Sequence, residues 1–248
     1  MNRSEGERLR WLGHATVLLE LGGARLLTDP LLRRRLWHLS RRGPVPAVGG
    51  PVDGVLISHV HRDHLDLRSL AGLEGAPTVL GPRGLGDLLH GRGMGEIVEL
   101  EEGESASIAG VRVIATAARH PARRGRRSPW VPSLGFVVEA GSRIYFAGDS
   151  DIYPEMAQLA PVDVALLPVW GWGPKLGTGH MNPRSAAQAL QLLRPRVAVP
   201  IHWGTYWPTG WGGPRLIEPP REFARHAGEV APQVEVRILS QGETLELD

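Results

Sequence analysis

The chain has 248 residues, of which 42% are hydrophobic and 22% charged, so we expect one globular domain spanning residues 1–248. Its 28 basic residues nearly balance 26 acidic ones, which argues against a nucleic-acid-binding protein. There is no cysteine and no apolar run of about 20 residues, which excludes disulfides, thiolate metal ligands and a membrane-spanning helix, and we expect a cytoplasmic protein.

The N-terminal segment predicts three short strands. Residues 8–20 indicate two strands joined by a turn that contains His14, and residues 24–28 indicate a third. Asp29 follows this third strand and precedes a proline, which disfavours helical geometry. Asp29 therefore either supports a metal-bound histidine or caps the loop, and His14 either lines a site or packs locally.

The next segment, residues 31–42, is basic and amphipathic. Leu32, Leu36 and Leu39 recur at helical spacing with arginines between them. Two interpretations remain open. The segment contacts anionic lipid, or it forms a flap over the site whose leucines pack inward and whose arginines are solvated.

The most informative stretch is residues 55–67, V-L-I-S-H-V-H-R-D-H-L-D-L, where an apolar strand ends in a polar cluster. His59 and His61 are two residues apart, so in an extended chain they point the same way and can bind one ion together. Asp63 and His64 lie beyond the strand and leave in another direction. This spacing predicts a site for two metal ions.

The rest of the chain alternates strands and helices, and several strands again end in polar side chains. We expect strands at 77–81, 96–100, 111–118, 134–140, 143–147, 162–169, 196–201 and 234–239, and helices at 84–90, 152–159, 182–194 and 218–226. The side chains at strand ends are Asp29, His59, His61, His120, Asp149 and His202. The carboxyl ends of strands in an open α/β layer meet at one edge, so these groups should converge.

These motifs resemble the signature of the metallo-β-lactamase superfamily, whose members are mostly dinuclear hydrolases. The resemblance rests on His59-x-His61-x-Asp63-His64 and extends over Trp11 to about Glu218. Three further motifs, residues 11–16, 179–183 and 202–205, are similar to those of the N-acylphosphatidylethanolamine phospholipase D-like and ascorbate-6-phosphate lactonase-like branch. The fold implied is an α/β (α+β) protein, a four-layer αββα sandwich.

The resemblance also implies roles for individual residues. The first metal would be bound by His59, His61 and His120, the second by Asp63, His64 and His202, and Asp149 would bridge the two. Two divalent ions are expected, zinc first, with manganese or iron as alternatives. A hydroxide shared by the ions would be the nucleophile. His180 is the candidate that binds the substrate or protonates the leaving group, followed by Asp63.

Three functions follow as hypotheses. The first is hydrolysis of an anionic phosphodiester, either a small molecule or lipid-like; the second is opening of a sugar-phosphate lactone; the third is a non-catalytic metal-binding or scaffold module. Arginines at 119–127 either receive a phosphate or are solvated, and five tryptophans either line the substrate site or pack in the core: Trp170, Trp172, Trp203, Trp207 and Trp211. Arg184-Ser185 stand where that branch commonly has acidic residues, which argues against a membrane substrate, whereas peripheral membrane contact stays open.

Overall fold

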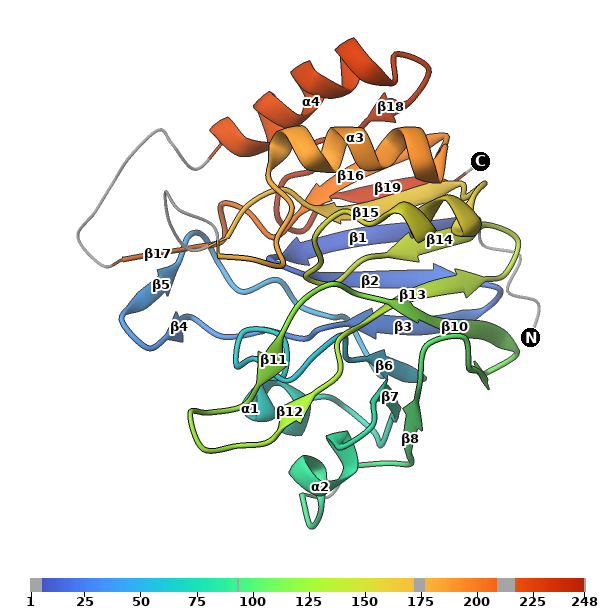
Figure 1. The fold of residues 1–248 in the computed structure, drawn as a ribbon. Coiled ribbons are helices and arrows are strands. Elements are labelled where there is room, and N and C mark those ends of the chain that lie inside the picture. Colours follow the sequence, from blue (N-terminus) through green and yellow to red (C-terminus); the bar gives the residue numbers. More distant parts are fainter. Residues whose placement is uncertain (1–5, 93, 172–176, 209–216, 248) are drawn as a thin grey trace.

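The computed structural model describes residues 6–92, 94–171, 177–208 and 217–247, and two seven-stranded sheets form its centre (Figure 1). The first sheet has the order β19-β1-β2-β3-β6-β7-β8. Its strands are β1 (Glu7–Gly13), β2 (Thr16–Leu21), β3 (Ala24–Thr28), β6 (Gly54–Leu56), β7 (Thr78–Pro82), β8 (Ile97–Leu100) and β19 (Thr244–Leu247).

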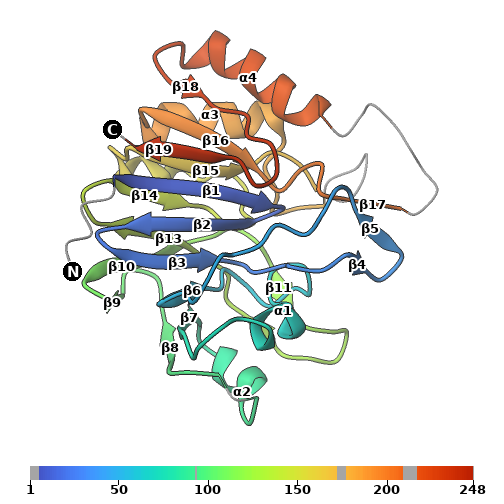
Figure 2. The same ribbon diagram turned by 180° about the vertical axis from the view of Figure 1, so that it is seen from behind.

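The second sheet has the order β18-β16-β15-β14-β13-β10-β9. It faces the viewer in Figure 1, and the first sheet faces the viewer in Figure 2. Its strands are β9 (Ser105–Ile108), β10 (Val111–Ala117), β13 (Leu134–Glu139), β14 (Arg143–Phe146), β15 (Val164–Pro168), β16 (Val197–Ile201) and β18 (Glu235–Val236).

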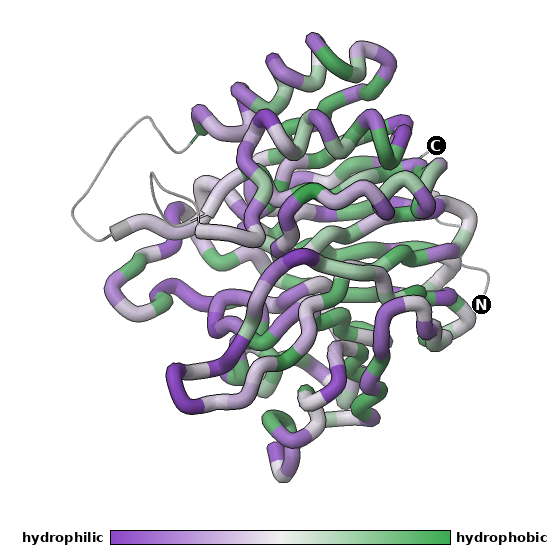
Figure 3. Tube along the Cα trace, viewed as in Figure 1, coloured by the Kyte–Doolittle hydropathy of each residue, from purple (hydrophilic) through white to green (hydrophobic). Residues whose placement is uncertain are grey.

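The first sheet is buried on both faces, which explains its nearly continuous apolar runs. Leu19 of β2 and Leu26 of β3 belong to the core shared with the second sheet. Their neighbours Leu18 and Leu27 pack in a separate cluster on the opposite face, because successive side chains of a strand alternate in direction. Green strands in Figure 3 mark this apolar interior. Full burial of one leucine stabilises the fold by about 1.5–3 kcal/mol.

Helices complete the outer layers. Side chains of α1 (Leu67–Ala71) and α2 (Leu85–Leu89) join the cluster on the outer face of the first sheet. On the other side, α3 (Pro183–Leu193) packs on β15, and α4 (Glu218–Val230) packs on α3. This arrangement confirms the predicted four-layer αββα sandwich. No helix among the described residues is long and apolar enough to cross a membrane.

Strands from both sheets end at one edge of the sandwich, on the left in Figure 1. In the first sheet β3 and β6 are parallel, and in the second β14, β15 and β16 are parallel. The strand β10 runs in the same direction as β14 because each is antiparallel to β13. The polar segments that follow these strands therefore meet, as the sequence predicts.

The leucines of residues 31–42 have helical spacing, but the segment contains a β-hairpin instead of a helix. Its strands are β4 (Arg35–Leu36) and β5 (Leu39–Arg41). A third strand, β17 (Tyr206–Pro208), extends this small sheet. Leu36 and Leu39 oppose each other across a two-residue turn, so residues three apart share one face here as they would on a helix. Both leucines are buried with Leu31 and Tyr206, as the flap interpretation expects, while Arg34, Arg35 and Arg42 are exposed, so contact of the arginines with anionic lipid stays open.

Smaller differences concern short elements. The helix expected at 152–159 is a 3₁₀ helix, η1 (Pro154–Leu159), and the strand expected at 234–239 pairs only over Glu235–Val236. Strands β9 and β19, helix α1 and a hairpin of β11 (Ala122–Arg123) and β12 (Trp130–Val131) were not predicted. Their brevity explains this, since two to five residues carry too little hydrophobic periodicity to be recognised.

One buried cation, Arg41, joins three segments near this edge. Its Nη1 donates to the carbonyl of Leu12 and to Oε1 of Gln241, each at 2.9 Å, and its Nη2 donates to the carbonyl of Leu31 at 2.6 Å. Gly13 has a φ of +104°, and a Cβ there would lie 2.8 Å from Arg41 Nη1, so only glycine fits. The guanidinium thus ties the β1–β2 turn to the hairpin and to the C-terminal segment.

We predict that Arg41→Met lowers the free energy of unfolding by about 3 kcal/mol, because it removes the hydrogen bonds that the guanidinium donates to the buried carbonyls of Leu12 and Leu31. Urea unfolding followed by circular dichroism measures this difference. Arg42→Met is the matched control, since Arg42 is exposed, and its effect should stay within about 0.5 kcal/mol. Equal stabilities of the two variants would contradict the role given to Arg41.

Candidate metal centre

Three imidazoles from two strand ends converge at the common edge, and we call them the first histidine group. His59 and His61 follow β6, and His120 follows β10. Nδ1 of His61 lies 3.1 Å from Nε2 of His59 and 3.0 Å from Nε2 of His120. The two-residue spacing in the sequence thus brings both histidines to one point, and His120 joins them from the other sheet.

A second group forms beside the first from His64, His202, Asp63 and His14. Nε2 of His64 lies 3.1 Å from Nε2 of His202. Oδ2 of Asp63 lies 3.5 Å from His64 Nε2 and 3.7 Å from His202 Nε2. These ligand atoms lie close enough together to hold one metal ion.

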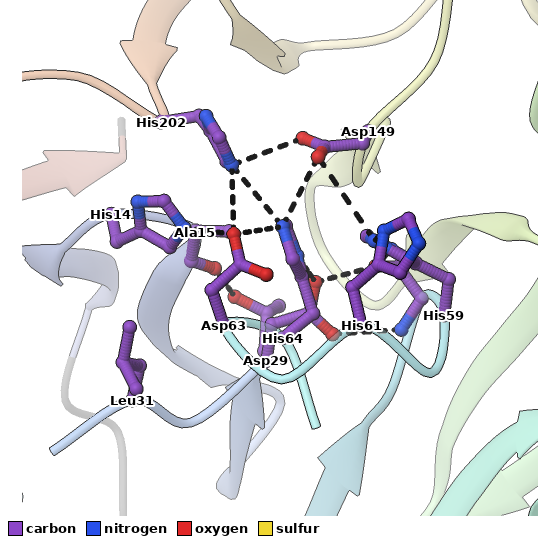
Figure 4. A network of polar contacts seen from close by, with 12 residues as sticks. His14, Ala15, Asp29, Leu31, His59, His61, Asp63, His64, Asp149 and His202 are labelled. Carbon is purple, nitrogen blue, oxygen red and sulfur yellow. Dashed lines mark hydrogen bonds and ion pairs between the residues drawn. The ribbon is translucent and has the colours of Figure 1, made fainter. Parts of the chain in front are cut away.

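The carboxylate of Asp149, just after β14, lies between the two groups (Figure 4). Its Oδ2 is 4.0 Å from Nε2 of His59 and 3.2 Å from Nε2 of His64, and its Oδ1 is 3.3 Å from Nε2 of His202. Oδ1 is buried and has no hydrogen-bond partner among the described residues. A buried carboxylate oxygen in this condition is costly unless a cation neutralises it, so the donor set fits metal ions.

In four imidazoles Nδ1 points away from the centre of the site and donates a hydrogen bond, which leaves Nε2, on the side of the site, as an acceptor. Nδ1 of His120 donates to the carbonyl of Gly179 at 2.9 Å, and Nδ1 of His202 donates to the carbonyl of Trp170 at 2.8 Å. A carbonyl only accepts, so these bonds place the proton on Nδ1 and leave Nε2 with its lone pair. That is the tautomer that binds a metal through Nε2.

Asp29 sets the same tautomer in the other two imidazoles. Its Oδ2 accepts from Nδ1 of His64 at 2.7 Å and from Oγ of Ser58 at 2.5 Å. Since the Ser58 hydroxyl proton goes to Asp29, its Oγ accepts from Nδ1 of His59 at 3.0 Å. Both roles left open for Asp29 are present, because its Oδ2 supports the histidines while its Oδ1 accepts from the backbone N–H of Ser58 at 2.7 Å.

His14, also left open by the sequence, lies within the site. Its Nε2 is 3.1 Å from Oδ2 of Asp63, and its carbonyl accepts from the backbone N–H of His202 at 2.9 Å. Its own N–H donates to Oγ1 of Thr205 at 2.6 Å. His14 adopts a left-handed φ of +54°, which is uncommon for a residue with a side chain. It therefore positions two members of the second group at once.

The interior of the site keeps most of these imidazoles neutral. Burial lowers the pKa of His59 well below its ordinary value, lowers that of His61, and lowers the pKa of His120 to about 4. His64 is the exception. Burial alone would lower its pKa, but Asp149, Asp63 and Asp29 raise it well above the ordinary value. The same negative surroundings that favour a proton on His64 also favour a metal cation.

His180 lies at the border of the site rather than inside it. Its Nε2 is 3.4 Å from Oδ2 of Asp149, and its side chain is 21% exposed. Its ring packs edge-on against the ring of His120, with 4.6 Å between the ring centroids. Burial alone would lower its pKa, but the hydrogen bond and charge of Asp149 raise it. A partly exposed imidazole with a raised pKa can reach a substrate and carry a proton to it.

The arginines and tryptophans for which a substrate contact was one alternative do not share one position in the structure. Arg124 donates to the carbonyls of Val60 at 3.2 Å and Leu65 at 2.5 Å, so it holds the ligand loop and is not available to a phosphate in this arrangement. Trp203 is buried and stacks on Trp11, with 4.8 Å between the ring centroids, so Trp203 packs in the core. Trp170 stacks on Trp207, with 6.0 Å between the ring centroids. Trp172 and Trp211 lie outside the described residues.

Fold and site define a metal-dependent hydrolase with the metallo-β-lactamase fold. A family model described as "Beta-lactamase superfamily domain" matches residues 24–203. A relative in Opitutus terrae, described as a UPF0173 metal-dependent hydrolase, is 34% identical over 97% of this chain and 100% of its own length. A relative of the same description in Pyrobaculum arsenaticum is 33% identical over 97% and 100%. The chain belongs to the UPF0173 metal-dependent hydrolase family of the β-lactamase superfamily.

A solved structure shows the same fold. Igni18, described as a novel metallo hydrolase from the archaeon Ignicoccus hospitalis, matches with a TM-score of 0.74 at 24% sequence identity, covering 98% of this chain and 99% of that one. At this identity the likeness concerns the fold alone.

We predict that Asp29→Asn weakens metal binding by about 10- to 100-fold, because both carboxylate oxygens accept hydrogen bonds, Oδ1 from the backbone N–H of Ser58 and Oδ2 from His64 and the Ser58 hydroxyl, whereas an amide has only one acceptor oxygen. Competition with a chromophoric chelator measures the affinity. Asp53→Asn is the control, since Asp53 is an exposed carboxylate that accepts from the Arg25 backbone N–H. Unchanged affinity in Asp29→Asn would show that Asp29 serves the loop and not the metal.

Proposed function

We propose that the protein is a dinuclear metal-dependent hydrolase. The observation that supports this best is the position of Asp149 between the two groups: its Oδ2 lies 4.0 Å from Nε2 of His59 in the first group and 3.2 Å from Nε2 of His64 in the second. The first metal would be held by His59, His61 and His120, and the second by Asp63, His64 and His202, with Asp149 shared. Imidazole and carboxylate ligands suit zinc, and also manganese or iron.

Bound divalent cations would supply Lewis acidity and lower the pKa of water to near neutrality. The protein's own residues provide the rest. The hydrogen bonds that the imidazoles donate to Asp29, Gly179 and Trp170 orient the rings before substrate arrives, so little reorganisation is needed during the reaction. His180 protonates the leaving oxygen from the border of the site, with Asp63 as the alternative acid.

The substrate class we propose is an anionic phosphodiester, small or lipid-like. Two observations support it: a divalent-metal site suited to a negatively charged oxygen, and the similarity of residues 11–16, 179–183 and 202–205 to the phospholipase D-like branch. That branch also includes lactonases, so a sugar-phosphate-type lactone is the substrate to compare. Acid release from a lactone without phosphodiester cleavage would favour the second activity.

Metal content and turnover should fall together in ligand variants. We predict about two metals per wild-type chain, and fewer in His59→Ala and Asp149→Asn, with kcat/KM for bis(p-nitrophenyl) phosphate lowered at least about 100-fold because the Lewis acid is lost. Metal analysis by mass spectrometry and a chelation series measure both. His90→Ala, at an exposed position outside the site, should keep metal and activity. Normal turnover of metal-free protein would end the proposal of a metal-dependent hydrolase.

His180→Gln tests the proposed acid through the leaving group. We predict that kcat falls by about 100-fold for a phosphodiester with an alkyl alcohol leaving group, which needs protonation. For a p-nitrophenyl ester, whose leaving group is stable without a proton, the loss should be less than about fivefold. Equal losses for both substrates, or loss of metal, would assign His180 to binding instead of proton transfer.

A further inference from the structure

Positive charge is concentrated in two segments of this chain. Residues 30–52 and 105–138 contain eleven arginines and neither aspartate nor glutamate. The remaining residues hold 17 of the 28 basic side chains and all 26 acidic ones, so they are net negative. The small overall charge of +2 therefore conceals an uneven distribution along the chain, although Arg33, Arg112 and Arg119 form ion pairs with acidic residues outside these segments. The first segment contains the β4–β5 hairpin and the second contains the β11–β12 hairpin.

An exposed tryptophan lies at the turn of the first hairpin. Trp37 is 65% exposed and adopts a left-handed φ of +52° in the two-residue turn between Leu36 and Leu39. Glycine is the usual residue at such a position, and a bulky side chain there is strained. Three exposed arginines lie near it in the sequence: Arg34, Arg35 and Arg42.

The second hairpin repeats this combination. Trp130 is 62% exposed, and the guanidinium of Arg123 lies 4.9 Å from the centre of its ring. Arg126 and Arg127 are exposed in the loop between the two strands, which is coloured as strongly hydrophilic in Figure 3. Trp37 and Trp130 are the two large hydrophobic side chains that are exposed among the described residues.

Both hairpins are anchored to the body of the protein and extend from the same side. Leu36 and Leu39 pack with Leu31 and Tyr206 under the first, and Arg124 bonds the second to the ligand loop. Figures 1 and 2 show both hairpins at the side where the strands of the two sheets end. The hairpins that carry the two tryptophans therefore lie on the same side of the molecule as the metal centre, and each hairpin is anchored by contacts with the rest of the protein.

We propose that the tips of these two hairpins dock the protein onto an anionic lipid surface. Indole rings favour the boundary between headgroups and acyl chains, where they bury an apolar body and keep the N–H hydrated. Arginines beside them attract anionic headgroups and bind phosphates bidentately. The acid-rich remainder of the chain would be repelled, which orients the hairpins and the metal centre toward the membrane.

A lipid surface fits this arrangement better than a nucleic acid does. Proteins that bind single strands place several aromatic rings along one basic groove, so that successive bases stack. Here the exposed rings are two and lie on the ends of separate hairpins. A flat, anionic and deformable partner can engage both ends at once. This docking goes beyond the proposed hydrolysis and needs no metal, so either can fail without the other.

Co-sedimentation with vesicles tests the docking on metal-free and metal-loaded full-length protein. Phosphatidylcholine vesicles are compared with vesicles that contain roughly 30% phosphatidylglycerol, at low and high salt. We expect binding only to the anionic vesicles, a decrease of at least tenfold in Trp37→Ala/Trp130→Ala, a similar decrease in Arg34→Glu/Arg126→Glu, and weakening by salt. Turnover of a small phosphodiester should persist in the tryptophan variant, because neither residue contacts the described ligands.

A matched control separates docking from general charge. Arg225→Glu/Arg237→Glu makes the same change of charge at exposed arginines outside the two segments and should bind vesicles like the wild type. Three results would overturn the proposal: no binding to anionic vesicles, binding that the tryptophan and arginine variants leave intact, or tighter binding to poly(U) that the same variants abolish. The last would assign the surface to nucleic acid.

Discussion

The structure depends on placing a buried carboxylate, Asp149, among imidazoles that come from both sheets. Burying this charge costs free energy unless positive partners surround it. Close packing of the sheets makes the position possible. Gly148, with a φ of +58°, lies so near the ligand loop that a Cβ would come within 2.5 Å of the Cβ of Ser58. A larger residue at 148 would push Asp149 away from His59 and His64.

A second carboxylate, Asp29, decides how these imidazoles present themselves. It receives the protons of Ser58 and His64 and, through Ser58, fixes the orientation of His59. Thr16 holds the Asp29 segment in turn, because its Oγ1 donates to the Asp29 carbonyl at 2.8 Å. One strand end of the first sheet thus governs an imidazole in each of the two groups, which couples them structurally before any ion binds.

The fold and the convergence of the candidate ligands could be predicted from the sequence because the ligands lie in the segments that follow apolar strands, and strand ends of a sandwich meet. It could not predict the carbonyls of Gly179 and Trp170 as acceptors, since every residue has a carbonyl. Ser58 carries a usable signal, because it is a polar residue that ends an apolar run. The spacing of Leu36 and Leu39 does not distinguish a helix from a hairpin, because side chains three residues apart share one face in a helix and across a two-residue hairpin turn.

The central claim is that two metal ions share Asp149, and anomalous X-ray diffraction from metal-loaded crystals tests it most directly. The account predicts two anomalous peaks per chain, one bound by His59, His61 and His120 and the other by Asp63, His64 and His202, with a different Asp149 oxygen nearest each. A single peak, or two peaks of which only one contacts Asp149, would contradict it.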